Sequence, residues 1–340
     1  MTDHTITRRR AARHFIAAPF VLAAGAGGVR AEPLNLDLVN EYPATSLPGE
    51  ADSFFAATVA KELAGKLTVR PISDARSGLN ARQQFSAVSL GTSAMANTLG
   101  GALSQFRPAL ALAALPFQTP TVAAARRLFD MAAPRYTEVF AQLNHRLLFV
   151  SPWPASGLWT TRPVSGPEDL ARLRVRTYDV TGTAVFSRLS ARAEVVSFAD
   201  LEPRLADGSI DAVLSSGDGG AGRQLWRRLP CFAALNYAVP LSFGTINLDL
   251  WNGFDAEIRA RLEAAGQATT ERQWAAMAGR VEQNYQTMRQ NGMIITDPVP
   301  VPLVGALQAA AAPAVEAWLE TAGAEDRAIL ARYRELAAAP

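Results

Sequence analysis

The sequence predicts an α/β fold divided into two similar lobes. Apolar stretches with strand character alternate with stretches of helical spacing, and strands that alternate with helices of this length are typical of a mostly parallel sheet. The halves echo each other, because Val88-x-x-Gly91 and Leu205-x-x-Gly208 each end a predicted helix on glycine before a strand. The 340 residues, 49% of them hydrophobic, suffice for a large core and favour two lobes.

The first lobe opens with a strand–helix–strand unit. Residues 34–38 alternate leucine with polar side chains, as a strand does. Phe55, Val59 and Leu63 then follow at helical spacing within residues 50–64. The further elements expected in this lobe are a strand at 67–72, a helix at 79–89, a strand at 93–97, helices at 122–131 and 134–143, and a strand at 147–150.

The second lobe is expected to begin near Trp159. Pro167–Leu170 predicts a short helical turn that leads into a strand at 173–178. The elements expected after it are a helix at 181–190, a strand at 193–197, a helix at 199–207 and a strand at 210–214. Residues 254–290 contain no proline and predict a long helix with Gly266 as its expected break, and a helical region at 303–338 ends the chain.

The first 31 residues have the layout of a secretory signal peptide. Arg8–Arg10 and Arg13 form a basic region, residues 15–28 form an apolar stretch too short to span a bilayer, and Val29-Arg30-Ala31 offers small residues for cleavage. We therefore expect export to the periplasm, and the adjacent arginines leave the twin-arginine route open. The alternative is a basic amphipathic start of a cytosolic protein, which the lack of polar residues within 15–28 disfavours.

Removal of this segment changes the charge of the chain. It takes away five arginines and one aspartate, so 28 of 33 basic and 30 of 31 acidic residues remain. The basic pI of the precursor therefore does not indicate a nucleic-acid partner. No later apolar run is as long as a membrane span, so the mature protein is expected to be soluble. The single cysteine, Cys231, is expected to be a buried small side chain.

Side chains for catalysis are scarce in the mature chain. Two of the three histidines lie in the signal segment, and His145 remains. One histidine and one cysteine cannot form a zinc cluster, so neither a metal nor a cofactor is expected. His145 lies between a helical pattern and a strand, a position that disfavours a role as base for a catalytic serine. The composition therefore favours a binding protein over an enzyme.

Three patterns follow one another in the second half of the chain. They are Pro167-Glu168-Asp169-Leu170-x-x-Leu173-Arg174-Val175-Arg176, Leu205-x-x-Gly208-x-Ile210-Asp211 and Phe243-x-x-Ile246-Asn247-x-x-x-Trp251. Their order and spacing, behind a signal peptide, resemble the periplasmic solute-binding proteins of TRAP transporters, the dicarboxylate-binding-protein-like family. The resemblance covers nearly all of the mature chain.

Within that family the chain is most similar to a branch with a Trp-Pro motif and a serine-rich turn. Trp153-Pro154 and Ser215-Ser216 carry this similarity. The turn departs from the branch at Asp218-Gly219, where Thr-Gly is usual, and Ala238 stands where the branch has tryptophan. Both departures fall near the expected pocket, so the ligand of the branch is not carried over.

The resemblance implies a two-lobed clamshell of the type II periplasmic-binding-protein-like fold, with a long helix bracing both lobes. Residues 32–156 and 243–283 are expected to form the first lobe, and residues 157–242 and 284–340 the second. The clamshell is expected to close on a small organic acid and deliver it to the membrane subunits of a TRAP transporter. The alternatives are a clamshell that serves a sensor or another transporter class, and a periplasmic enzyme with the same lobes.

Arg176 is the expected ligand anchor. It lies near the end of a predicted strand, and strand ends of open α/β lobes face the crevice where ligands bind. A planar guanidinium offers two parallel donors to a carboxylate and keeps its charge, and the resemblance implies this role for Arg176. The alternative is an ordinary surface arginine, as Arg172 and Arg174 are expected to be.

Aromatic and small polar residues are expected to complete the ligand site. The expected walls are Tyr42, Trp153, Trp159, Tyr178 and Phe198, with ordinary core packing as the alternative for each. Ser215 and Ser216 either reach the ligand or form a plain turn, and Asn247 either lines the pocket or pairs with backbone. A second arginine that is common in the family is missing at Leu158-Trp159. With the aromatic residues, this predicts a monocarboxylate that has an apolar or aromatic body.

Overall fold

The chain builds two β-sheets within residues 33–338, the range that the computed structural model describes. The predicted signal peptide, residues 1–31, lies outside the described residues. The first sheet has the strand order β2-β1-β3-β10-β4, with β1 Leu34–Val39, β2 Leu67–Ile72, β3 Met95–Leu99, β4 His145–Pro152 and β10 Leu241–Asn247. The second has the order β11-β9-β5-β8-β6-β7, with β5 Ser156–Thr160, β6 Arg174–Thr177, β7 Arg192–Val195, β8 Ala212–Ser216, β9 Cys231–Ala233 and β11 Ile294–Thr296.

Each sheet contains one strand that runs against the others. In the first sheet, β10 is antiparallel to both β3 and β4. In the second, β5 is antiparallel to both β8 and β9. The prediction of two mostly parallel sheets is therefore confirmed. Both antiparallel strands are buried along their whole length, and a strand buried on both faces shows no alternation in its sequence, which is why the sequence pattern does not reveal them.

Helices cover the first sheet, as the strand–helix alternation predicts. They are α1 Leu47–Glu62, α2 Ala81–Ser89, α3 Val122–Gln142 and α7 Leu248–Asn252, with 3₁₀ turns at η1 Gly100–Leu103 and η2 Pro108–Ala114. The prediction of two helices around Pro134 is wrong, because α3 is continuous. Pro134 is exposed, so the backbone carbonyl that it leaves unpaired faces water, while Leu128, Ala132 and Tyr136 form one buried stripe along the helix.

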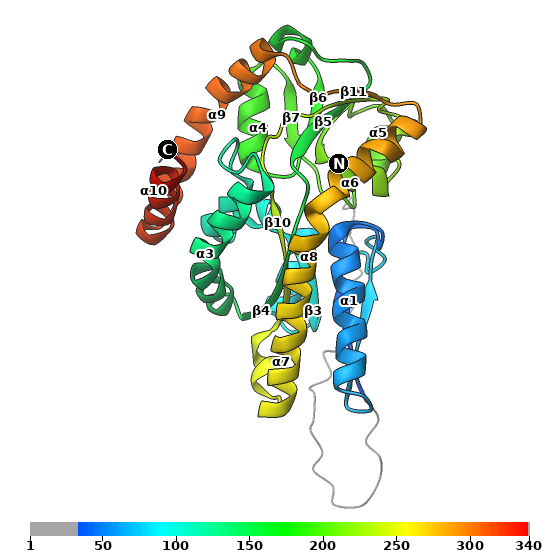
Figure 1. The fold of residues 1–340 in the computed structure, drawn as a ribbon, viewed down its shortest axis with the longest axis vertical. Helices are drawn as coiled ribbons and strands as arrows, with labels where there is room; N and C mark the ends of the chain where they lie inside the picture. The colour runs from blue at the N-terminus through cyan, green and yellow to red at the C-terminus, as the bar shows by residue number, and fades with distance from the viewer. Residues whose placement is uncertain (1–32, 339–340) are drawn as a thin grey trace, which may run out of the picture. The chain divides into compact units, whose positions relative to one another are not determined.

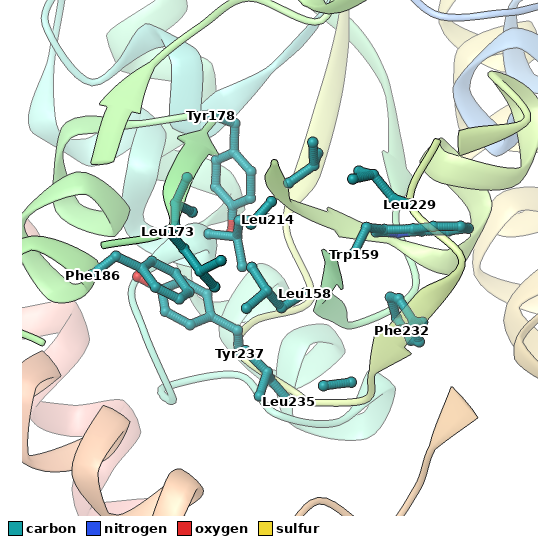
Figure 2. Close-up of a cluster of buried hydrophobic side chains, with 14 of the residues drawn as sticks. Leu158, Trp159, Leu173, Tyr178, Phe186, Leu214, Leu229, Phe232, Leu235 and Tyr237 are labelled. Atoms are coloured by element: carbon teal, nitrogen blue, oxygen red, sulfur yellow. The ribbon is translucent and has the colours of Figure 1, made fainter. Parts of the chain in front are cut away.

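The second lobe surrounds its sheet with shorter helices. They are α4 Val180–Arg188, α5 Leu201–Ala206 and α6 Gly217–Gly222, with 3₁₀ turns at η3 Pro167–Leu170 and η4 Leu225–Arg227. Figure 2 shows part of the core of this lobe, where Leu158, Tyr178 and Tyr237 approach one another. Cys231 is buried and free, as predicted.

The long helix α8, Ala256–Gln290, contacts both lobes (Figure 1). It packs on α1 and β4 of the first lobe and on α6 and β11 of the second, which confirms the predicted brace. The break lies at Ala278 and Gly279 rather than at Gly266, since Gly279 has a φ of 82°. Gly266 stays helical, and a Cβ there would lie 2.2 Å from the Leu148 carbonyl oxygen, so glycine lets α8 lie directly against β4.

Two further helices end the described chain. Helix α9, Val301–Thr321, contacts α4 of the second lobe, whereas α10, Ala324–Ala338, contacts α3 of the first. The lobe boundaries given above stay a prediction. Within residues 33–338, no helix has the length and apolarity that crossing a bilayer requires.

Candidate ligand-binding site

Arg176 lies on β6, the strand between β7 and β8, and is only 2% exposed. Backbone carbonyls of the flanking segments hold its guanidinium. Nε donates to the Val196 carbonyl at 2.7 Å, and Nη1 donates to the Leu214 carbonyl at 3.1 Å. The ring of Phe198 packs against the cation, with its centre 5.7 Å from Cζ. The guanidinium is therefore fixed in position by its own lobe.

Arg176 forms no ion pair with an acidic side chain of residues 33–338, although Arg174 on the same strand pairs with Asp211. Asp179 is close enough to feel the charge of Arg176. Burial raises the pKa of Asp179 to about 7, against the hydrogen bond from the Gly182 amide and the charge of Arg176, so this carboxyl is a weak counter-charge near neutral pH. A buried cation without a strong counter-charge is costly, and an anionic ligand would relieve that cost.

Two small cavities adjoin Arg176, each about 20 Å³ in volume. The first is lined by Tyr42, Leu99, Trp153, Ser156, Arg176, Tyr178, Ser215, Ser216 and Pro240. These residues come from both lobes. A volume of this size holds about one water molecule, whereas clefts for small molecules measure roughly 300–1,000 Å³. Admission of a ligand therefore requires the lobes or the lining side chains to move apart.

Tyr42 and Tyr178 place phenol hydroxyls beside Arg176. Burial raises the pKa of both phenols far above the ordinary value, and the charge of Arg176 offsets only part of this increase. Both hydroxyls therefore stay protonated and able to donate hydrogen bonds. Ser156 adds a third hydroxyl, 3.5 Å from that of Tyr178. Described residues line the first cavity with one cation and several hydroxyls but no carboxylate, a combination suited to an anion.

The aromatic wall of the first cavity is held in place by packing and one hydrogen bond. The Tyr42 ring centre lies 4.6 Å from that of Trp153 and 4.5 Å from that of Phe198. Trp153 Nε1 donates to Ser242 Oγ at 2.9 Å, which fixes the orientation of the indole. Phe198 does not line the cavity and instead supports Tyr42 and Arg176 from behind.

The two serines of the predicted turn differ in their roles. Both line the first cavity at the end of β8. The Ser216 hydroxyl accepts from the Gly219 amide at 3.1 Å and caps α6, so it is already used by the fold. Ser215 forms no side-chain hydrogen bond with the described residues and is 7% exposed, so its hydroxyl is the one available to a ligand.

The structure does not bring Trp159 and Asn247 to either cavity. Trp159 is fully buried in the core of the second lobe beside Phe232 (Figure 2), and its Nε1 donates to the Ser216 carbonyl at 3.2 Å. Asn247 caps α7 by accepting from the Leu250 amide, and its Nδ2 donates to the Val88 carbonyl at 2.8 Å. Trp159 therefore packs in the core and Asn247 pairs with backbone, which are the alternatives to a ligand role for these residues.

Several residues that line the cavities are not predicted from the sequence. Leu99, Ser156 and Pro240 line the first cavity, but no pattern in the chain singles them out. Glu41 and Arg82 line the second cavity. Of these two, only Glu41 has a sequence position, at a strand end, that indicates a place near the crevice. The buried Glu41 carboxylate joins the lobes, because Oε2 accepts from Ser197 Oγ at 2.6 Å and from the Ala199 amide at 3.2 Å.

His145 is buried in the first lobe, away from both cavities. Its ring stacks on Phe85 and hydrogen-bonds with Ser89 and Thr245. Burial lowers the pKa of His145 to about 4, only partly opposed by a hydrogen bond that the ring donates to the backbone of Phe85, so the ring is neutral at ordinary pH. The part of the chain that the structure describes has no group of three or more His, Cys, Asp or Glu side chains placed to hold a metal.

The two lobes and the long helix that contacts both define the class of protein, a two-lobed solute-binding protein. Residues 38–321 match the family described as bacterial extracellular solute-binding protein, family 7, and the chain belongs to that family. Members are non-enzymatic receptors, as the scarcity of catalytic side chains predicts. No curated protein matches the chain.

Solved structures of similar fold bind organic acids. The Bordetella pertussis extracytoplasmic solute receptor DctP7, which binds pyroglutamic acid, has a TM-score of 0.84 and 25% identity, covering 88% of this chain and 99% of its own. A marine metagenome TRAP solute-binding protein specific for pyroglutamate has a TM-score of 0.84 and 25% identity over 89% of this chain and 99% of its own. A Roseobacter denitrificans TRAP solute-binding protein with bound β-D-glucuronate has a TM-score of 0.81 at 18% identity, over 88% and 98%, and so supports the fold alone.

Proposed function

We propose that this protein captures a small monocarboxylate at Arg176 and delivers it to the membrane subunits of a TRAP transporter. The observation that carries the proposal is the buried guanidinium without an ion-pair partner among residues 33–338. Its two backbone bonds orient the group, and no carboxylate of the described residues lies within ion-pair distance of it. A ligand carboxylate would supply both the missing charge and acceptors for the remaining donors.

Arg176 alone does not account for useful affinity. A hydrogen bond to a charged group contributes about 1.5–3 kcal/mol, whereas a micromolar Kd corresponds to about 8 kcal/mol. The remainder must come from the Tyr42 and Tyr178 hydroxyls, from Ser215, and from burial of the ligand against the Tyr42 and Trp153 rings. All of these groups surround a ligand only when both lobes contribute.

The lining favours a compact acid with few hydroxyl groups. The first cavity offers one cation, a few hydroxyls and aromatic faces, so it has few partners for a polyhydroxylated sugar acid. Pyroglutamate, the ligand of the two relatives at 25% identity, is compact, with one carboxylate on a small ring. We therefore propose a ligand of this size and charge. The apolar body predicted from the sequence would then be a small ring.

Calorimetry on residues 32–340 tests the ligand class. Pyroglutamate is compared with pyroglutamide, its neutral carboxamide, and with glucuronate, which is larger and hydroxyl-rich. We expect pyroglutamate or a monocarboxylate of similar size to bind and the carboxamide to bind at least tenfold more weakly. At 100 times its Kd such a ligand should stabilise the fold by about 2.7 kcal/mol, visible as a raised Tm.

Variants of Arg176 test the anchor. Arg176→Lys keeps a charge but not the planar fork, and Arg176→Gln removes the charge, so affinity should fall in that order. Equal affinity of both variants and the parent protein for the acid, or equal affinity for acid and carboxamide, would rule out Arg176 as the anchor.

Delivery and location are tested separately. We propose that residues 1–31 are a signal peptide for export by the general or the twin-arginine route. We also propose that one lobe is residues 32–156 with 243–283 and the other is residues 157–242 with 284–340.

Uptake of radiolabelled ligand into vesicles that hold the TRAP subunits should require this protein. Amino-terminal sequencing of the protein recovered from a periplasmic fraction should begin at Glu32. Uptake that is independent of the protein would contradict the proposed partner.

A further inference from the structure

Asp218 carries a buried carboxylate at the contact between the two lobes. It lies on α6, two residues after Ser216, and is 2% exposed. A buried carboxylate needs several partners. The ligand site proposed above does not use it, since Asp218 does not line either cavity that adjoins Arg176.

The partners of Asp218 come from both lobes. Oδ1 accepts from Arg280 Nε at 2.5 Å and from Asn284 Nδ2 at 3.4 Å. Oδ2 accepts from the Leu47 amide at 2.8 Å. Leu47 is the first residue of α1, a helix of 16 residues, so the carboxylate lies where the helix presents unpaired amides and a partial positive charge.

Arg280 extends the same contact. Its Nη1 donates to Glu50 Oε1 at 2.9 Å, and its Nη2 donates to the Thr45 carbonyl at 2.8 Å. Burial by itself lowers the pKa of Arg280, but the carboxylates of Asp218 and Glu50 raise it overall, so the guanidinium stays charged. Asp218 and Arg280 thus contribute one acceptor and two donors to this contact. The first lobe contributes the Leu47 amide as donor and the Thr45 carbonyl and Glu50 carboxylate as acceptors.

Although the proposed lobe boundary falls at residue 283, Arg280 packs with Asp218 on the second-lobe side, because the part of α8 that follows its break lies against α6. Arg280 follows Gly279, and the helix beyond that point packs on α6, where a Cβ at Gly217 would contact Asn284 and Met288 at 3.5 Å. The pair can therefore stay assembled on the second lobe, whereas its three bonds to Thr45, Leu47 and Glu50 require the first lobe to be in contact. Of the bonds that this pair makes, these three are the ones that lobe separation would break.

We propose that Asp218 and Arg280 form an ionic clasp on the start of α1 that holds the lobes together and positions the Ser215–Ser216 turn over the ligand. The clasp does not contact the ligand, so Asp218 and Arg280 are positioning residues. Its effect on ligand residence rests on the proposed function above. Its effect on the unliganded protein does not.

The distance between the lobes tests the clasp without a ligand. Dyes are attached at Lys61→Cys, at the end of α1, and Arg188→Cys, at the end of α4, in a Cys231→Ala background, and energy transfer between them is recorded in single molecules. Both labelled positions are exposed. We expect Asp218→Asn and Arg280→Gln each to shift the population toward separated lobes. The double variant should add little to either single change, because each removes the same contact.

Ligand kinetics give the second readout. Using pyroglutamate, or the acid that calorimetry identifies, we expect Asp218→Asn to raise koff about tenfold, the effect of losing one hydrogen bond to a charged group, and to change kon much less. Asp218→Glu should recover part of the residence time. The control is Arg261→Gln, which removes the exposed ion pair with Glu62 that joins α8 to α1 within the first lobe, and it should change neither the lobe distance nor koff.

The outcomes separate the two proposals. If no acid binds but the variants shift the lobe distance, the clasp stands and the proposed ligand class fails. If acids bind and Asp218→Asn lowers only Tm, leaving lobe distance and koff as in the parent protein, Asp218 serves folding alone and the clasp is overturned.

Discussion

Gly101 of the first lobe lies directly against Tyr178 of the second. A Cβ built on Gly101 would be 3.1 Å from Tyr178 Cδ2 and 3.1 Å from Asp179 Oδ2, closer than ordinary van der Waals contact. Both tyrosine and aspartate are buried at this point, so little room exists for them to retreat. The absence of a side chain at Gly101 is therefore a condition for the lobes to meet at the ligand site.

Gly101→Val is predicted to weaken ligand binding more than it destabilises the fold. Overpacking costs about 1–3 kcal/mol, and lobe separation can relieve it, so the cost should appear in closure. Affinity for the acid should fall about tenfold or more in calorimetry, while Tm of the unliganded protein changes little. Gly305→Val is the control, because a Cβ at Gly305 has nothing within 4 Å. Equal losses of Tm and affinity in Gly101→Val would show a folding defect instead.

Tyr42→Phe is predicted to lower ligand affinity by about 10- to 100-fold, because it removes a protonated hydroxyl beside Arg176 and keeps the ring. The stacking on Trp153 and Phe198 should persist, so near-ultraviolet circular dichroism should be unchanged. Tyr333→Phe is the matched control, because it removes a hydrogen bond to the Gln118 carbonyl, and neither residue lines a cavity beside Arg176. This variant should leave affinity unchanged. Unchanged affinity in Tyr42→Phe would remove its hydroxyl from the site.

Arg82 is predicted to speed the arrival of the ligand without holding it. Its side chain is exposed and lines the second cavity, on the approach to Arg176. A charge at the rim acts mainly on the association rate and is screened by salt. Arg82→Ala should therefore slow kon severalfold at low ionic strength and have no effect at high salt, as measured by stopped flow. Arg127→Ala, an exposed arginine on α3, should change neither rate. A change confined to koff would instead place Arg82 in contact with the bound acid.

Acid is predicted to destabilise the first lobe through His145. Burial lowers the pKa of His145 from 6.5 to about 4, so the unfolded chain binds the proton more readily than the native one. This contribution to stability is complete above pH 6.5 and is lost as pH falls toward 4, about 3 kcal/mol in all. Asp52 acts in the opposite direction, because burial raises its pKa to about 7 against hydrogen bonds from Asn40 and Asn97, and its contribution is lost as pH rises toward 7.

His145→Gln separates the two effects. Glutamine can still reach Ser89 and Thr245 but does not titrate. The difference in the free energy of unfolding between the parent protein and this variant, from urea melts between pH 4 and 7, should fall steadily with acid. A difference that is independent of pH would show that His145 does not titrate in that range.

Much of the site could be predicted because it lies at strand ends. Tyr42 follows β1, and Arg176 and Ser215 lie near the ends of β6 and β8, where the topology of such sheets places a crevice. Trp159 lies on β5, one residue after Leu158, and sequence position alone does not say which face of a buried strand meets a cavity. Asn247 ends β10, which runs antiparallel to β3 and β4, so it lies at the edge of the sheet where β4 begins and not at the edge where β4 ends.

The contacts between lobes could not be predicted from local patterns. The Leu47 amide and the Asp218 carboxylate are 171 residues apart in the chain. Neither the glycine at position 101 nor the one at 279 is distinguished by its sequence surroundings from the other glycines. Their roles follow from what packs against them in three dimensions, or from a backbone angle that the sequence does not display.

The burial of Arg176 also determines how cargo would be given up. Inside the closed cleft the guanidinium and a carboxylate attract each other strongly, because no water screens them. Once the lobes part, water reaches both charges and competes for every donor and acceptor. Release then requires no covalent bond to be broken and no energy source in this protein, since water replaces the hydrogen bonds to the ligand. A membrane partner that separates the lobes when it binds this protein would thereby release the acid.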